Sequence, residues 1–124
     1  MTVLAGRYAV AQLAPDAALP GWSLDGEVTC VVRTPAELSI VCVEASVPQD
    51  VRAERGFRAL VVDGALDFAL TGILASVTGP LAGAKISLFA FSTFDTDYVM
   101  VKEDRLDAAI AALRAAGLGV AQTT

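Results

Sequence analysis

Short runs of alternating apolar and polar residues fill the first half of the chain, and Pro, Gly or charged residues separate them. Alternation with a period of two is typical of half-buried β-strands. A Thr-Pro-Ala-Glu turn lies between the second and third runs, so we expect these two to form a hairpin. Pro20, Gly21 and Trp22 indicate an irregular linker before it. The strands predicted in this half are 7–13, 27–33 and 38–44.

The period changes in the second half, after a polar connector at 47–56 and a predicted strand at 57–63. From Asp67 onward apolar residues recur at spacings of three and four, which indicates a helix that Pro80 should kink or restart. A second hairpin is predicted from strands 86–91 and 98–102. Asp104 is expected to cap a last helix that ends at Gly117, before a short strand at 118–121. The predicted core-facing helix residues are Phe68, Leu70, Ile73, Leu74, Val77, Leu81, Leu106, Ala109, Ile110 and Leu113.

The order of elements in the second half is β-α-β-β-α-β. This is the α+β, ferredoxin-like arrangement, an antiparallel sheet with helices on one face. The first half repeats it in reduced form, because VRTPAELSIVCVEA can be aligned with FSTFDTDYVMVKED. We therefore predict two tandem halves in a single unit, a reduced one at 1–56 and a complete one at 57–124.

Composition excludes several classes of function. The net charge of −5 argues against nucleic-acid binding, and no apolar run reaches the length of a membrane span. The start of the chain does not have the pattern of a secretory signal, so we expect a cytoplasmic protein. The chain contains no His, which removes His bases, His–Ser pairs and His metal ligands. No metal site or cofactor is predicted.

Two groups of reactive or charged residues have ordinary structural interpretations. Arg52, Arg55 and Arg58 alternate with acidic residues, so we interpret them as a solvated turn; a phosphate site is the alternative. Cys30 and Cys42 lie near each other across the first predicted hairpin. We expect two buried free thiols, with a disulfide or redox switch as the alternative.

The second half resembles the ACT-domain family, and within it the small tandem-ACT proteins related to the CASTOR arginine sensors. TGIL, GPLAGAKIS and STFDTDYVMV carry the resemblance together. Such domains bind an amino acid between two copies and regulate another protein. The resemblance implies a ligand site formed by the start of the first helix and the second hairpin. The residues that it implies are Thr71, Gly72, Ile73, Ser92, Thr93, Phe94 and Asp97.

The chemistry of these residues suits an amino acid. Free N–H groups at a helix start suit a carboxylate, and Gly72 allows a close approach of the backbone. Asp97 or Asp67 would suit an ammonium group, and Phe94 or Phe68 would cover the ligand. Each residue also has a structural alternative: Asp67 as a helix cap, Asp97 as a turn residue, Phe94 as a core or dimer contact and Gly72 as a packing residue.

We therefore expect a non-catalytic regulatory domain that binds an amino acid and acts through the geometry of a homodimer. The alternative is a ligand-free ACT-like module that only binds an unidentified protein target. An enzyme is disfavoured, because no nucleophile and base occur at a recognisable spacing. Leu70 occupies the position where the arginine sensors carry an acidic residue, so the identity of the ligand stays open.

Overall fold

The computed structural model describes residues 1–63 and 71–122. The chain divides into two units. The N-terminal unit is Gly6–Phe57, and the C-terminal unit combines Met1–Ala5 with Arg58–Thr124. Strand β5, Ala53–Val61, contributes its first residues to one unit and its last residues to the other. The α+β class is confirmed, and each unit is described below by itself.

The C-terminal unit has the predicted β-α-β-β-α-β order, with one additional strand. Its strands are hydrogen-bonded in the order β6-β7-β5-β1-β8. The additional strand, β1, lies between β5 and β8, antiparallel to the first and parallel to the second. The elements are β1 (Thr2–Val3), the end of β5, α1 (Ile73–Gly83), β6 (Leu88–Ser92), β7 (Asp97–Lys102), the 3₁₀ helix η3 (Glu103–Arg105), α2 (Leu106–Ala115) and β8 (Ala121–Gln122).

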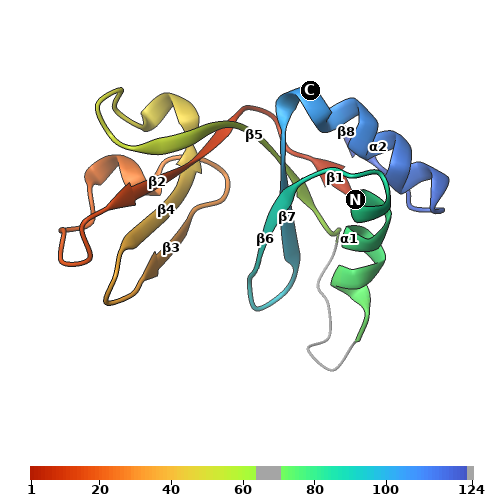
Figure 1. The fold of residues 1–124 in the computed structure, drawn as a ribbon, viewed down its shortest axis with the longest axis horizontal. Coiled ribbons are helices and arrows are strands. Elements are labelled where there is room, and N and C mark those ends of the chain that lie inside the picture. The colour runs from red at the N-terminus through yellow and green to blue at the C-terminus, as the bar shows by residue number, and fades with distance from the viewer. Residues whose placement is uncertain (64–70, 123–124) are drawn as a thin grey trace. The chain divides into compact units, whose positions relative to one another are not determined.

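Both α-helices contribute to one core in this unit, and Figure 1 shows them side by side. The predicted face of the last helix is confirmed, because its four expected residues are buried. In α1, Val77 and Leu81 are buried as expected and Leu74 is partly buried. Phe68 and Leu70 lie outside the described residues. The helix continues through Pro80, so the expected restart at that residue is wrong.

The two helices end in the same way. At the end of α2 the N–H of Leu118 donates to the carbonyl of Leu113, and the N–H of Gly117 donates to the carbonyl of Arg114. Gly117 has a φ of +93°. This is a Schellman motif, so the predicted stop at Gly117 is confirmed. At the end of α1, Lys85 takes the place of the glycine, with φ 60°. The predicted Asp104 cap is wrong, because Asp104 lies in η3 and no side chain of the described residues caps α2.

The N-terminal unit contains strands in the order β3-β4-β2-β5. Short 3₁₀ helices stand where the C-terminal unit has longer helical segments. The stretch predicted as an irregular linker therefore contains one helical turn. The elements are β2 (Tyr8–Leu13), η1 (Gly21–Leu24), β3 (Cys30–Arg33), β4 (Leu38–Val43), η2 (Glu44–Ser46) and the start of β5.

The two hairpin turns have matching hydrogen bonds. In the first, the Oγ1 atom of Thr34 accepts from the N–H groups of Ala36 and Glu37, both at 3.1 Å. In the second, the Oγ1 atom of Thr93 accepts from the corresponding two N–H groups at 3.3 and 3.1 Å. A threonine hydroxyl of this kind stabilises a turn locally. The two aligned segments therefore fold alike at their turns.

The solvated turn predicted around the arginines is wrong for two of the three. Arg55 lies in β5 and donates to the carbonyls of Val47, Pro48 and Val51. Arg58 is also in β5, with a side chain only 16% exposed, and donates to the carbonyl of Leu4 at 3.2 Å. Both side chains therefore donate to backbone carbonyls and are not part of a solvated turn.

The cysteines lie on opposite faces of their hairpin. Cys30 pairs with Val41, the neighbour of Cys42, and adjacent residues of a strand point to opposite faces. This geometry is incompatible with a disulfide between them. Cys42 is fully buried, as predicted, whereas Cys30 is half-buried. Burial raises the pKa of both thiols, and the negative charge of Asp25 adds to the effect at Cys42.

Candidate functional site

The turn between β6 and β7 forms one part of the predicted site. The Oγ of Ser92 donates to a carboxylate oxygen of Asp97 at 2.5 Å, across the last pair of the hairpin. The carbonyl of Asp97 accepts from the N–H of Val62 at 3.1 Å, and the Oγ1 of Thr96 donates to the carbonyl of Val62 at 2.6 Å. These bonds fix the turn to the end of β5. The ring of Phe91 stacks on that of Tyr98 one pair further along.

The start of α1 forms the other part. Gly72 precedes the first helical residue with φ 78° and ψ 0°, a left-handed conformation that favours glycine. Among the described residues no side chain caps this helix, so its first N–H groups have no side-chain acceptor from that part of the chain. A Cβ atom at Gly72 would meet no atom within 4 Å, so the glycine is needed for its conformation and not for packing. Thr71 is exposed beside it.

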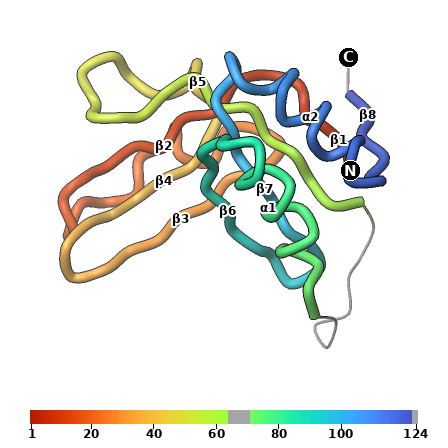
Figure 2. The backbone as a smooth tube through the Cα atoms, turned by 45° about the vertical axis from the view of Figure 1, so that its right-hand side comes forward, coloured from red at the N-terminus to blue at the C-terminus, as the bar shows by residue number. Residues whose placement is uncertain are grey.

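Both parts lie at the same end of the C-terminal unit. In Figure 1 and Figure 2 the turn between β6 and β7 and the first turn of α1 are on the side where β5 ends. No hydrogen bond joins Thr71, Gly72 or Ile73 to Ser92 or Asp97 in the part of the chain that the structure describes. Asp67 and Phe68 lie outside that part, so their predicted roles stay predictions.

Phe94 does not have the core position proposed as its structural alternative. Its side chain is 82% exposed at the tip of the turn. Thr93 uses its hydroxyl within the turn, as described above. The chemistry available here is therefore a carboxylate held by a hydroxyl, an exposed aromatic ring, and, at the helix start, N–H groups able to donate to an anion.

The N-terminal unit contains a hollow that the sequence analysis did not select. It has a volume of about 220 Å³ and is lined by residues of β2, β4 and β5, together with Glu37 just before β4 and Arg52 just before β5. The signal in the sequence is weak, because alternate polar residues in a strand normally face water. Among the described residues no group of three or more acidic or Cys side chains is placed to hold a metal ion, and no helix has the length and apolar character to cross a membrane.

Comparisons with known proteins agree with this architecture. A family model described as an ACT domain matches residues 52–115, and a second, described as an N-terminal domain, matches residues 6–50. Subunit 1 of the cytosolic arginine sensor for mTORC1 is 45% identical over 56 residues in Bos taurus and 41% identical over 56 residues in Homo sapiens. These matches cover 44% and 45% of this chain but only 17% of each relative.

Solved structures extend the likeness to the whole chain. A crystal structure of an Agobacterium tumefaciens protein is 36% identical, with a TM-score of 0.93, and the match covers 99% of this chain and 92% of that one. The ligand-free regulatory subunit of aspartate kinase from Thermus thermophilus has a TM-score of 0.62 at 11% identity, over 90% of this chain and 93% of that one. At this identity the second likeness concerns the fold alone.

Proposed function

The chain belongs to the ACT-domain family, and from this membership we propose that it is a non-catalytic regulatory protein that binds a free amino acid. Two of the similar proteins are named for regulation, one as an arginine sensor and one as a regulatory subunit of aspartate kinase. Because the arginine sensors match over a small part of their own length, the ligand and the regulated partner are not transferred from them. A cytoplasmic location belongs to the same proposal.

The proposed ligand site is the end of the C-terminal unit where the turn and the start of α1 lie. The helix start at Gly72, which no side chain of the described residues caps, is the observation that carries the proposal, because its N–H groups suit the carboxylate of an amino acid. Asp97 would accept a charge-assisted hydrogen bond from the ammonium group. Ser92 orients that carboxylate through its hydroxyl. Phe94 would cover the ligand side chain, with Thr71, Ile73 and Thr93 beside it.

We further propose that the N-terminal and C-terminal units are a reduced and a complete ACT-like half, and that two chains form the functional dimer. The matching hydrogen bonds of the two hairpin turns support the repeat. A ligand that binds one dimer geometry more tightly than another would shift the population toward that geometry. This shift is how occupancy of the site would reach a regulated protein.

A thermal-shift screen of the full chain against the twenty amino acids tests the proposal. A ligand at a concentration of about a hundred times its Kd stabilises the folded protein by about 2.7 kcal/mol, which raises Tm by several degrees. Asp97→Asn should abolish that rise by removing the partner of the ammonium group. Asp95→Asn is the matched control, since Asp95 is an exposed acid of the same turn. A screen in which no amino acid raises Tm would contradict the proposal.

The exposure of Phe94 favours one alternative, a ligand-free module that binds a protein partner. An aromatic side chain that is 82% exposed at a turn is suited to insert into a partner surface. On that reading Phe94→Ser would weaken capture of the partner, and amino acids would leave Tm unchanged. The same thermal-shift screen therefore separates the two functions.

A further inference from the structure

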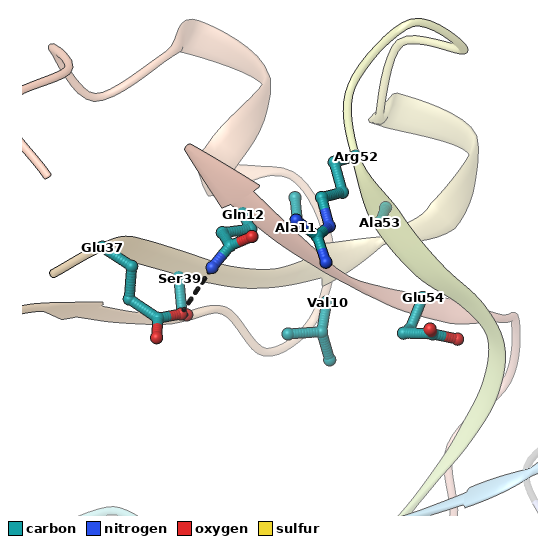
Figure 3. Close-up of a pocket in the computed structure, with 8 residues that line it drawn as sticks. All are labelled: Val10, Ala11, Gln12, Glu37, Ser39, Arg52, Ala53 and Glu54. Carbon is teal, nitrogen blue, oxygen red and sulfur yellow. Dashed lines mark hydrogen bonds between the residues drawn. The ribbon is translucent and has the colours of Figure 1, made fainter. Parts of the chain in front are cut away.

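The hollow in the N-terminal unit is built on the face of the strands that does not carry the core. Figure 3 shows Gln12, Glu37 and Arg52 pointing to one side, whereas Ala11 and Ala53 point to the other. Ala11 is fully buried, which identifies the second side as the core side. Long polar side chains stand around short ones here, and this difference in length creates the hollow of about 220 Å³.

The β5 side of the hollow carries the positive charge of Arg52, and the carboxylate of Glu54 lines the same hollow. The guanidinium of Arg52 forms no ion pair and no hydrogen bond with any of the residues that the structure describes; only its backbone carbonyl is bonded, to the N–H of Gln12. Its side chain is exposed and extends toward β2 in Figure 3. A guanidinium in this state can bind a carboxylate through two parallel hydrogen bonds.

The β4 side carries a carboxylate with a defined orientation. The Oε1 atom of Glu37 accepts two hydrogen bonds, one from the hydroxyl of Ser39 at 2.6 Å and one from the side-chain amide of Gln12 at 3.5 Å. Its other oxygen, Oε2, accepts no hydrogen bond from the described residues. The side chain is therefore held in place while one oxygen remains available for a donor from solution.

The two charges lie beside different strands, and the middle strand presents Gln12 between them and the apolar Val10 two residues away on the same face. Glu37 adjoins β4, Arg52 adjoins β5, and β2 lies between these strands. Neighbouring strands are about 4.8 Å apart, so the attachment points of the two side chains are roughly 10 Å apart across β2. Val10 of β2 lines the same hollow. Val10 is paired with Glu54 of β5, whose side chain also lines the hollow. The hollow therefore has Arg52 and Glu54 on the β5 side, Gln12 and Val10 on β2, and Glu37 on the β4 side.

We propose that this hollow binds a small linear zwitterion whose carboxylate and ammonium groups are separated by several methylene groups. The carboxylate pairs with Arg52, the methylene groups pack on Val10 and the ammonium group donates to Oε2 of Glu37. The class includes ω-amino acids and lysine. An α-amino acid without a terminal ammonium group, such as glycine, is too short to span both charges. This site is separate from the proposed amino-acid site, since every residue that lines it belongs to the N-terminal unit.

Titration of the ¹⁵N-labelled full chain, followed by amide NMR spectra, tests the proposal. The probes are 6-aminohexanoate, 4-aminobutanoate and glycine, with hexanoate and hexylamine as analogues that lack one charged group. We expect 6-aminohexanoate to shift the amide signals of Val10, Gln12 and Ala53, and to bind more tightly than the other four probes. Loss of one charge-assisted hydrogen bond should weaken binding by at least about tenfold.

Variants assign the effect to named side chains. Arg52→Gln and Glu37→Gln should each weaken binding of 6-aminohexanoate by at least about tenfold, and Arg52→Lys should weaken it less. Arg105→Gln is the matched control, because Arg105 is an exposed arginine of the C-terminal unit. Both test residues point away from the core, so unchanged Tm values should show that the variants fold.

Three outcomes would overturn the proposal. The first is that millimolar 6-aminohexanoate shifts no signal of the N-terminal unit. The second is that hexanoate binds as tightly as 6-aminohexanoate and Glu37→Gln has no effect, which would indicate a simple anion site. The third is that binding persists in Arg52→Gln with shifts confined to Gly72 and to Ser92 and Asp97. That third result would support the proposed amino-acid site while removing this one, so the two proposals fail separately.

Discussion

The Oε1 atom of Glu44 accepts a hydrogen bond of 2.6 Å from the backbone N–H of Gly56. Gly56, with φ +81°, lies in the part of β5 where the pairing with β2 shifts register between Tyr8 and Val10. A bulge of this kind leaves a backbone group without its partner in the neighbouring strand. The other oxygen of Glu44 lies 3.3 Å from the Nε of Arg7. One carboxylate therefore joins three segments of the N-terminal unit.

Glu44→Ala should lower the free energy of unfolding by about 1–3 kcal/mol, because it leaves a part-buried N–H without an acceptor. Urea denaturation measures the loss. Glu103→Ala is the matched control, since Glu103 opens η3 as Glu44 opens η2. Glu103 is 46% exposed and its ion pair with Arg58 is long, at 3.8 Å, so its removal should cost less than that of Glu44. Equal losses for the two variants would contradict this account of Glu44.

Lys85 occupies the left-handed position that ends α1, with φ 60°. The N–H of Lys85 donates to the carbonyl of Ala82 at 3.0 Å, and the N–H of Ile86 donates to the carbonyl of Leu81 at 2.9 Å. Ile86 is buried, so the motif also anchors the chain in the core. The left-handed conformation costs a residue with a Cβ atom about 1–2 kcal/mol and costs glycine almost nothing.

Lys85→Gly should therefore raise the free energy of unfolding by about 1 kcal/mol and Tm by about 3–6 °C. Differential scanning calorimetry measures both quantities. Lys85→Ala separates the conformational effect from the loss of charge, because alanine keeps the Cβ atom and should give no gain. If the alanine variant were as stable as the glycine variant, the backbone conformation of Lys85 would not be the cause.

Thr34 and Thr93 each accept two backbone hydrogen bonds in the turn of their own hairpin, Thr34 in the first and Thr93 in the second. Thr93→Val removes an oxygen that accepts from Asp95 and Thr96, and should cost about 1 kcal/mol. Thr34→Val should cost a similar amount, for the same reason. Serine keeps the hydroxyl, so Thr93→Ser should retain most of the stability. Equilibrium unfolding of the three variants would contradict the equivalence if only one valine substitution were destabilising.

Local patterns predicted the elements whose stability is local. The spacing of Leu106, Ala109, Ile110 and Leu113 predicted the buried face of α2, and Gly117 predicted its end. Strand β1 has no such pattern, because two residues show no period and its partners are Val61 and Ala121, far along the chain. A strand of this kind is defined by its neighbours alone.

The arginines and the hollow were missed for a related physical reason. Arg55 lies among charged residues, which suggests a solvated turn, yet its acceptors are carbonyls four to eight residues earlier. The hollow is made by residues in or beside three strands, and each of its long polar side chains alone is an ordinary outward-facing residue. The turn at 93–96 was easier to predict, because the side chains of Thr and Asp favour turns by hydrogen bonding to nearby backbone groups. Features that depend on several distant segments are the ones a single sequence leaves open.

The buried thiol of Cys42 makes stability depend on pH in the alkaline range. Desolvation, with the negative charge of Asp25 second, raises its pKa above the ordinary value. Between the ordinary and the raised pKa the folded chain keeps a proton that the unfolded chain has lost, so stability falls as pH rises through this range. The urea midpoint should therefore fall as the pH rises above the ordinary thiol pKa of about 8.5, and fall less in Cys42→Ala.

Alkylation with iodoacetamide gives an independent measurement of the same thiols. Cys30 is half-buried and should react first, whereas Cys42 is fully buried and should react only after unfolding. Mass spectrometry of the native protein should show one modified thiol and, after addition of urea, two. Because the thiols lie on opposite faces of the hairpin, oxidation should not join them within one chain. Rapid labelling of Cys42 in the native protein, or a disulfide between Cys30 and Cys42, would contradict the register of β3 and β4.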